Sequence, residues 1–357
     1  MIYWIIFSLT AVLSIYEILV GGSKASKTMF YVLCFFLVLF VGLRYDSVDY
    51  FSYQEIWERV DFTSFSIPFY LSYGGSTGNE FIFATILSFI KSLGGGFEFF
   101  IFLIALMSLC IKLHFFRVYS PYVFISIFIY LSFSLFKEMG QIRNALSAAI
   151  FLFAIKPMAE RKLASYTLIT LVSFGVQAST FIGFFAYWLY PLVKRKYYPY
   201  LILASAFLVS IFGGIASVLI GYSYYLPFQL SSRALSYFSK SEPLSYNYLN
   251  ISMLIFAIVL LWLRNIIIIK NKYLISLVTF HVYATSMYFL LFDFPVVAGR
   301  IIELLSFNSL AILLPVIISG LAGYKRFIFV IVIYFYMSLL FYSAVSSANS
   351  YKIVDLF

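Results

Sequence analysis

Apolar runs long enough to cross a lipid bilayer follow one another along most of the chain. A bilayer core of about 30 Å needs about 20 apolar residues in a helix, and a helix satisfies its own backbone N–H and C=O groups there. With 63% hydrophobic and 11% charged residues, the chain is predicted to be an all-α, polytopic membrane protein. The longest runs lie near residues 2–20, 28–43, 97–116, 121–136, 138–155, 199–221, 248–268, 273–292, 300–320 and 327–345.

Two further apolar stretches do not have the length of one transmembrane helix: one is too long and the other is too short. Residues 163–193 fit two short helices of about 15 residues each that turn near Gln177, which brings the total to about twelve transmembrane helices. Residues 80–93 cover only about 14 residues, so a re-entrant or interfacial helix on the outer face is expected there. Because no polar stretch is long enough for a separate domain, residues 1–357 are predicted to form a single transmembrane domain.

Positively charged loops set the predicted orientation. Short loops rich in Lys and Arg face the cytoplasm as a rule, so the outer loops are expected at about 44–79 and 222–247. If residues 80–93 crossed the membrane, every later basic loop would lie on the outer side, which contradicts this rule. The same loops account for the net charge of +10, and nothing in the chain indicates nucleic-acid binding. The residues that carry this assignment are Lys24, Lys27, Lys112, Arg117, Lys156, Arg161, Lys162, Lys194, Arg195, Lys196, Arg264, Lys270, Lys272, Lys325 and Arg326.

Polar side chains recur at the predicted outer ends of the spans. An ionisable side chain within a span is costly to bury and is by default a functional hypothesis. Structural alternatives exist for several of them: Arg143 pairs with Glu138 or snorkels outward, Arg300 pairs with Glu303 one helical turn away, and Asp49 is an ordinary loop acid. The candidates are Arg44, Asp46, Asp49, Tyr50, Glu80, Lys137, Glu138, Gln141, Arg143, Asn144, Gln177, Arg233, Arg300 and Glu303.

The spacing around Arg143 predicts a polar helix face. Lys137, Gln141 and Asn144 fall on one side of a helix that runs through all three. Arginine forks suit phosphate and pyrophosphate oxygens, while amides, carboxylates and tyrosines suit sugar hydroxyls, and a carboxylate can accept a proton from a hydroxyl nucleophile. Together these side chains favour a lipid-pyrophosphate-linked sugar as the substrate.

Common catalytic and metal motifs are absent from the sequence. The chain has no P-loop, HExxH, G-x-S-x-G or CxxC pair, and its two histidines have no companions at metal-ligand spacing. No metal and no cofactor are therefore expected.

Several segments, in order along the chain, carry a family resemblance. They are "GLRYDSVDYFSY" at 42–53, "NEFIFATILSFIKSLGG" at 79–95, "GQIRNALSAAIFLFAI" at 140–155, "ERK" at 160–162, "GVQASTFIGFFAYWLYPL" at 175–192 and "AGRIIELLSF" at 298–307. These segments resemble the EpsG-like family of Wzy-type bacterial polysaccharide polymerases, which make O-antigen, capsule or exopolysaccharide. This chain has Gln177 where the family's hairpin usually has histidine, and Ser47 and Val48 precede Asp49 where the family often has glycine.

The resemblance implies a multi-pass glycosyltransferase of the bacterial inner membrane, with a fold like that of lipid-donor (GT-C-like) enzymes and an active site facing the periplasm. It would transfer a growing glycan from undecaprenyl pyrophosphate to another lipid-linked repeat unit, together with a chain-length-regulating co-polymerase. On this hypothesis Arg143 and Arg300 hold pyrophosphate without a metal. Arg44 and Arg233 are secondary contacts, Asp49, Glu80 or Glu138 is the base, and Tyr50, Gln141, Gln177 and Glu303 contact substrate.

Two other functions remain open from the residues alone. An O-antigen ligase uses the same donor with a different acceptor, and the residues do not separate it from a polymerase. A polysaccharide flippase or other transporter would be expected to show paired halves and cytoplasmic access to the cationic cavity, and the sequence shows neither clearly.

Loop charges predict which introduced cysteines an impermeant reagent reaches. Cysteines at Ser64 and Ser241, in the two predicted outer loops, should react with an impermeant maleimide in intact cells, whereas a cysteine at Ser165, beside a basic turn, should react only after permeabilisation. Labelling of the Ser165 variant alone in intact cells would reverse the orientation.

Overall fold

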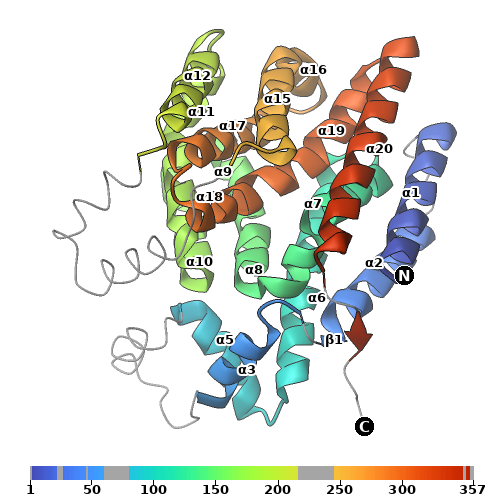
Figure 1. The fold of residues 1–357 in the computed structure, drawn as a ribbon, viewed down its shortest axis with the longest axis vertical. Helices are drawn as coiled ribbons and strands as arrows, with labels where there is room; N and C mark the ends of the chain where they lie inside the picture. Colours follow the sequence, from blue (N-terminus) through green and yellow to red (C-terminus); the bar gives the residue numbers. More distant parts are fainter. Residues whose placement is uncertain are drawn as a thin grey trace. The chain divides into compact units, whose positions relative to one another are not determined.

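The computed structural model describes residues 2–21, 27–45, 47–59, 80–215, 245–348 and 351–353 as an almost entirely helical chain (Figure 1). The first part contains α1 (Ile2–Val20), α2 (Lys27–Gly42), β1 (Arg44–Tyr45), α3 (Tyr50–Arg59), α5 (Phe81–Ser92), α6 (Phe97–Tyr119), α7 (Val123–Gly140) and α8 (Ile142–Phe151). Next come η1 (Leu152–Ala154), α9 (Ile155–Ala159), α10 (Leu163–Val176), η2 (Ala178–Phe185), α11 (Ala186–Val193) and α12 (Tyr198–Ile211). The last part contains α15 (Tyr248–Trp262), α16 (Arg264–Lys270), α17 (Leu274–Leu290), α18 (Pro295–Ile301), η4 (Ile302–Phe307), α19 (Asn308–Gly320), α20 (Gly323–Ser346) and β2 (Lys352–Ile353).

These helices confirm an all-α, membrane-embedded chain and leave the number of spans open. Among the described residues, six helices are long and apolar enough to cross a bilayer, and α15 with α16, bent by 64°, makes up to seven. Six other apolar helices have 10–17 residues, among them α2, α10 and α17. The total of about twelve spans therefore stays a prediction.

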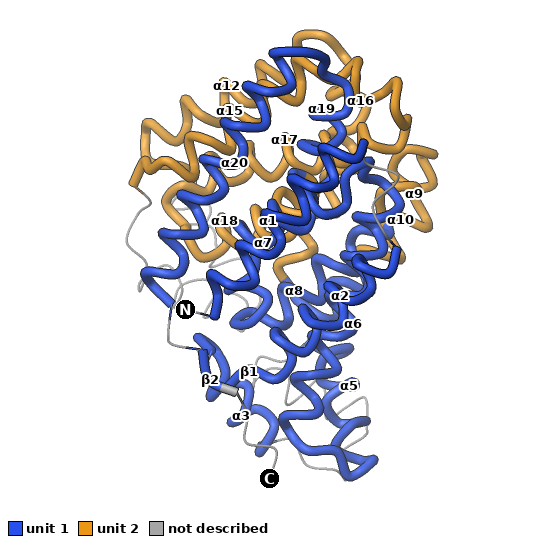
Figure 2. The backbone as a smooth tube through the Cα atoms, turned by 90° about the vertical axis from the view of Figure 1, so that its right-hand side faces the viewer, with its two compact units in different colours: residues 1–153, 171–178, 310–357 blue, residues 154–170, 179–309 orange. Residues whose placement is uncertain are grey.

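The chain forms two compact units, each assembled from separate stretches (Figure 2). Unit 1 contains residues 1–153, 171–178 and 310–357, and unit 2 contains residues 154–170 and 179–309. Because the chain passes repeatedly from one unit to the other, the units are not successive domains along the sequence. A single transmembrane domain remains the prediction.

In unit 1, contacts join ends that the loop charges assign to the cytoplasmic side. The buried Glu17 carboxylate, near the end of α1, accepts hydrogen bonds from backbone N–H groups of residues 123–125 at 2.8, 2.8 and 3.3 Å. These are orphan donors at the start of α7, where a carboxylate also complements the helix dipole. Arg326, near the start of α20, donates to the Tyr122 hydroxyl at 2.7 Å. These contacts bring the end of α1 and the start of α20 to the start of α7, and the side of the membrane stays a prediction.

At the opposite end of unit 1, Arg44 joins the C-termini of α2 and α7. Its guanidinium is almost wholly buried and donates to the carbonyl oxygens of Val41 and Met139, near the C-termini of α2 and α7. A cation at helix C-termini satisfies the last carbonyls and complements both dipoles. Beside it, β1 pairs antiparallel with β2.

The helix that the sequence places at 138–155 begins later than expected. α7 continues to Gly140, and the chain leaves helical geometry at Gln141 (φ −98°, ψ 61°) before α8 begins. The prediction of one polar helix face through Lys137, Gln141 and Asn144 is therefore wrong, since the first belongs to α7 and the last to α8. Gln141 lies at the joint between them.

The prediction that Lys112 belongs to a cytoplasmic loop is also wrong. Lys112 lies within α6, is 2% exposed, and pairs with Glu138 of α7 at 2.5 Å. The Tyr130 hydroxyl contacts both charged groups. A buried lysine needs such partners because an isolated charge away from water is strongly disfavoured. The alternative pairing of Arg143 with Glu138 is thereby excluded as well.

In unit 2, α17 lies at the centre and is buried along nearly its whole length. His281 on this helix hydrogen-bonds Ser306 Oγ at 2.7 Å and the Met253 carbonyl at 3.1 Å. The partner Ser306 lies in the π-helix η4, and π-helical turns are rare and concentrated at functional sites.

Removing the Glu17 carboxylate should destabilise unit 1. Glu17→Ala is expected to lower the apparent melting temperature in detergent by about 5 °C or more, because buried N–H groups without an acceptor cost about 1–3 kcal/mol. Glu17→Gln keeps one acceptor oxygen, so its melting temperature should lie between those of the unmodified protein and Glu17→Ala. Glu55→Ala removes an exposed acid of α3 and serves as the control, with a change under about 2 °C. Equal melting temperatures for all variants would show that the cap contributes nothing.

Candidate active site

An ion pair between distant segments forms the centre of the candidate site. Arg143 Nη1 lies 2.8 Å from Glu80 Oε2, and the two side chains are 21% and 14% exposed. Arg143 is in the first turn of α8, and Glu80 directly precedes α5. The pair is therefore mostly withdrawn from water but still accessible from one side.

Aromatic rings enclose the Arg143 guanidinium. Its central carbon lies 5.5 Å from the ring centroid of Tyr53 and 5.7 Å from that of Phe83. Both distances fit cation–π contacts, which strengthen when water is excluded. Burial raises the pKa of the Tyr53 phenol, and the Arg143 charge opposes this rise. The rings and Glu80 thus hold the guanidinium in one orientation.

Glu80 also connects this pair to the hairpin. Its second carboxylate oxygen accepts the Ala178 backbone N–H at 3.0 Å, one residue after the buried Gln177. α10 approaches α5 so closely that a Cβ added to Gly175 would lie 2.7 Å from Ile82. The structure therefore brings together Glu80, Arg143 and the Gln177 turn, three candidates from different parts of the sequence.

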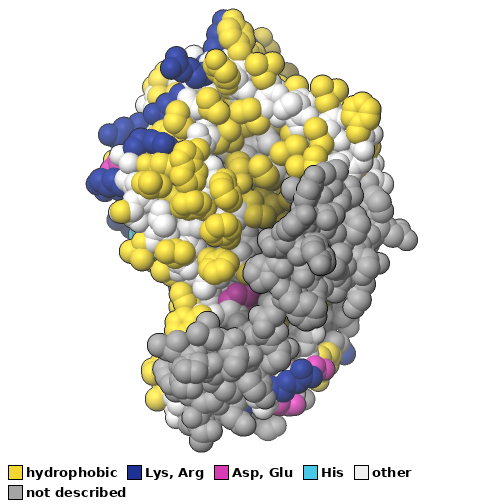
Figure 3. Space-filling model, turned by 90° about the vertical axis from the view of Figure 1, so that its left-hand side faces the viewer, with side chains coloured by type: hydrophobic (Ala, Val, Ile, Leu, Met, Phe, Trp, Pro, Cys, Tyr) yellow, Lys and Arg dark blue, Asp and Glu magenta, His cyan; other side chains and the backbone are white. Residues whose placement is uncertain are grey.

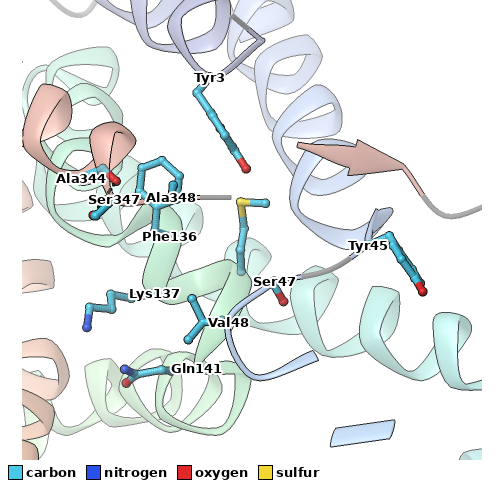
Figure 4. A pocket seen from close by; sticks show the side chains of 12 residues that line it. Tyr3, Tyr45, Ser47, Val48, Phe136, Lys137, Gln141, Ala344, Ser347 and Ala348 are labelled. Atoms are coloured by element: carbon cyan, nitrogen blue, oxygen red, sulfur yellow. Dashed lines mark hydrogen bonds between the residues drawn. The ribbon is translucent and has the colours of Figure 1, made fainter. Parts of the chain in front are cut away.

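A cavity of about 250 Å³ opens in unit 1 at the α7–α8 joint (Figure 4). Lys137 and Gln141 point to the same side of it, and within the described residues the Gln141 carboxamide oxygen accepts no hydrogen bond. Such an orphan acceptor suits a ligand hydroxyl. The other lining residues are Tyr3, Tyr45, Ser47, Val48, Phe136, Met139, Gly140, Ala344, Ser347 and Ala348.

The first outer segment packs onto the same joint. A Cβ added to Gly140 would lie 3.4 Å from Val48 Cβ, so Ser47 and Val48 sit directly against the end of α7. The half-buried Asp49 follows them and precedes α3. The Tyr50 ring, 2% exposed, packs edge-on against Phe97 and is part of the core. Asp49 therefore follows directly along the chain from two residues that line the cavity.

Other predicted site residues have structural partners, belong to unit 2, or fall outside the described part of the chain. Glu138 is buried with Lys112 and Tyr130, and Arg44 binds helix carbonyls. Arg300 and Glu303 are half-buried in unit 2, in α18 and η4. Asp46 and Arg233 lie outside the described residues.

No three or more His, Cys, Asp or Glu side chains gather at metal-binding distance in the described part of the chain. The cationic groups near the cavity are the side chains available to offset negative charge there. The expectation of a metal-free site stays a prediction.

Comparison with known families is decisive for identity. The model of the EpsG family matches residues 27–355. The chain belongs to the EpsG family. EpsG proteins are polysaccharide-polymerase-like membrane proteins of the Wzy type, so the resemblance in the sequence is confirmed. Comparisons with curated proteins and with solved structures give no match.

Sequence reasoning missed part of the candidate site in this EpsG protein. Tyr3 on α1, Phe136 on α7 and Ser347, directly after α20, line the cavity although they are far apart in the chain. Tyr3 packs against Phe136 with ring centroids 4.9 Å apart because α1 and α20 both pack on α7. No spacing in the sequence signals this meeting of the first and last helices.

Proposed function

We propose that this EpsG protein is a glycosyltransferase that polymerises undecaprenyl-pyrophosphate-linked repeat units at the periplasmic face of the bacterial inner membrane. The observation that carries the proposal is the partly exposed Arg143 guanidinium, which Glu80 and two aromatic rings fix in place two residues after Gln141, a residue that lines the cavity. A guanidinium presents five N–H donors in one planar group. Its planar fork matches pyrophosphate oxygens.

In the proposed reaction, a hydroxyl of the acceptor sugar attacks the anomeric carbon of the donor glycan. The bond from that carbon to pyrophosphate oxygen breaks, and undecaprenyl pyrophosphate leaves. Arg143 stabilises the negative charge that develops on the leaving oxygen, and a preorganised donor of this kind acts without a metal. Lys137 lines the cavity and brings a positive charge to it.

Asp49 is the proposed base that takes the hydroxyl proton. It follows Ser47 and Val48, which line the cavity, whereas Glu138 is enclosed by Lys112 and Tyr130. Glu80 is assigned a positioning part because both its oxygens are engaged, with Arg143 and with Ala178. The Gln141 carboxamide orients the acceptor sugar. The cavity is smaller than the roughly 300–1,000 Å³ typical of drug-sized ligands, which suits a single sugar unit.

Arg143→Lys should abolish long glycan chains in a deletion strain that expresses the full-length variant. Lysine keeps the charge but loses the planar fork, and loss of one preorganised donor slows reactions about 10²–10³-fold. Surface glycan should collapse from a ladder to single repeats. Arg59→Lys, an exposed arginine of α3, is the matched control and should give a normal ladder.

The deletion strain without any plasmid-borne copy separates the three alternative functions. Strains that express the unmodified protein or a variant are compared at equal amounts of that protein in the membrane. Single repeats attached to the final acceptor support a polymerase. Complete loss of attached glycan would instead indicate a ligase, and repeat units retained on the cytoplasmic side would indicate a flippase. A normal ladder from Arg143→Lys would overturn the assignment of Arg143 to pyrophosphate.

A further inference from the structure

A second cavity, of about 390 Å³, lies within unit 2 and far along the chain from the α7–α8 joint. Its walls come from the end of α9, the end of α11, α16 and the start of α17. They combine two lysines and two tyrosines with aliphatic groups: Ala159, Glu160, Tyr190, Lys194, Ile268, Lys272, Tyr273 and Ile275.

The two arginines near this cavity, Arg161 and Arg264, hydrogen-bond backbone carbonyl groups. Arg161 donates to the Tyr187 carbonyl at 2.6 Å and lies 3.8 Å from that ring's centroid. Arg264 donates to the carbonyls of Val193 and Arg195, at the end of α11. These two arginines hold the α9–α10 turn and the start of α16 against α11. Two lysines from other connections, Lys194 and Lys272, line the cavity.

Lys194 and Lys272 reach the cavity from two different connections. Each ammonium lies near a lining ring, with Lys194 Nζ 4.4 Å from the Tyr190 centroid and Lys272 Nζ 5.3 Å from that of Tyr273. Their separate origins bring two positive charges to one concave site, which suits a ligand with several anionic oxygens.

The single acid of the cavity has its own partners. Glu160 accepts from Lys162 at 2.7 Å and from the Tyr273 hydroxyl at 3.1 Å, and Lys156 lies 3.9 Å away. The hydrogen bond from Lys162 holds the pKa of Glu160 below its usual range. Because Lys162 already compensates this carboxylate, the cavity keeps the positive charge of Lys194 and Lys272.

Apolar and aromatic side chains are exposed around these connections. Tyr197 and Tyr198 precede or begin α12, while Trp262 and Ile269 lie on α15 and α16, and all four are more than half exposed. Tyr and Trp of this kind are typical of the boundary between headgroups and hydrocarbon. Figure 3 shows Lys and Arg side chains gathered along one edge beside a broad hydrophobic surface.

We propose that this cavity binds the phosphate of an anionic phospholipid headgroup, with Lys194 and Lys272 donating to its oxygens. The acyl chains then lie against the exposed aliphatic side chains of α16, such as Ile269. Basic pockets between membrane helices on the cytoplasmic side are suited to such headgroups, and the loop charges assign these connections to that side. This lipid would anchor the α11–α12 and α16–α17 connections, independently of the reaction proposed for unit 1.

Native mass spectrometry of the full chain in detergent, titrated with phosphatidylglycerol or phosphatidylcholine, tests the proposal. Phosphatidylglycerol should bind preferentially, and Lys194→Gln/Lys272→Gln should weaken its binding about tenfold. The matched control, Lys196→Gln/Lys270→Gln, removes the same charge from the same connections outside the cavity and should change affinity less than about twofold. An equal loss of phosphatidylglycerol affinity in both double variants would show that the lipid responds to surface charge in general, and this result would overturn the proposed site.

Two measurements on the unmodified chain keep the test independent of folding defects. A photoreactive phosphatidylglycerol should crosslink to peptides from residues 186–198 and 264–275, and crosslinks confined to other segments would overturn the proposal. Inorganic phosphate at millimolar concentration should leave phosphatidylglycerol bound. Complete displacement by inorganic phosphate would identify a site for soluble anions and contradict the assignment to lipid.

Discussion

The arrangement of the candidate site depends on the ion pair between Glu80 and Arg143. One carboxylate fixes the start of α5, the first turn of α8 and the hairpin after α10, because its two oxygens bind Arg143 and the Ala178 N–H. A mostly buried pair is costly to desolvate and is retained only with good geometry and further partners. Here Tyr53 and Phe83 supply those partners and keep water from the guanidinium. The result is a preorganised cation at the end of a membrane helix.

Charges in unit 1 divide into two groups by what they touch. Glu17 caps α7, Arg44 binds the last carbonyls of α2 and α7, and Lys112 pairs with Glu138 between α6 and α7. Each of these satisfies backbone groups or an opposite charge inside the bundle: Glu17 holds the start of α7, and Arg44 and Lys112 hold its last turn. The joint at Gln141 is thereby held between rigid elements, so that Lys137, Gln141 and Arg143 keep their relative positions. Structural charges thus support the polar groups assigned to the reaction.

The sequence predicts most helices well because hydrophobic runs, Gly and basic turns mark them directly. The hairpin near Gln177 and the short helix after Glu80 are both present. The break at Gln141 could not be read from spacing, since Lys137 to Ala149 continues a helical pattern. In the structure Arg44 binds the Met139 carbonyl and Val48 packs near Gly140, contacts that come from distant residues. The partners of Arg143 and Lys112 were missed for the same reason. Ion pairs between residues 63 and 26 positions apart leave no periodic signal, and neither does the π-helix at Glu303.

The most direct test of the account is the affinity of the purified full-length protein for a polyprenyl pyrophosphate, measured by calorimetry in EDTA so that no divalent ion bridges the phosphates. The account predicts that Arg143→Lys weakens binding about 10- to 100-fold, the effect of losing a charge-assisted hydrogen bond, while Arg59→Lys binds like the unmodified protein. The loss should be smaller for the polyprenyl monophosphate, which offers fewer oxygens to the fork. Equal affinity of the unmodified protein and Arg143→Lys for the pyrophosphate would contradict the claim that this arginine holds the leaving group.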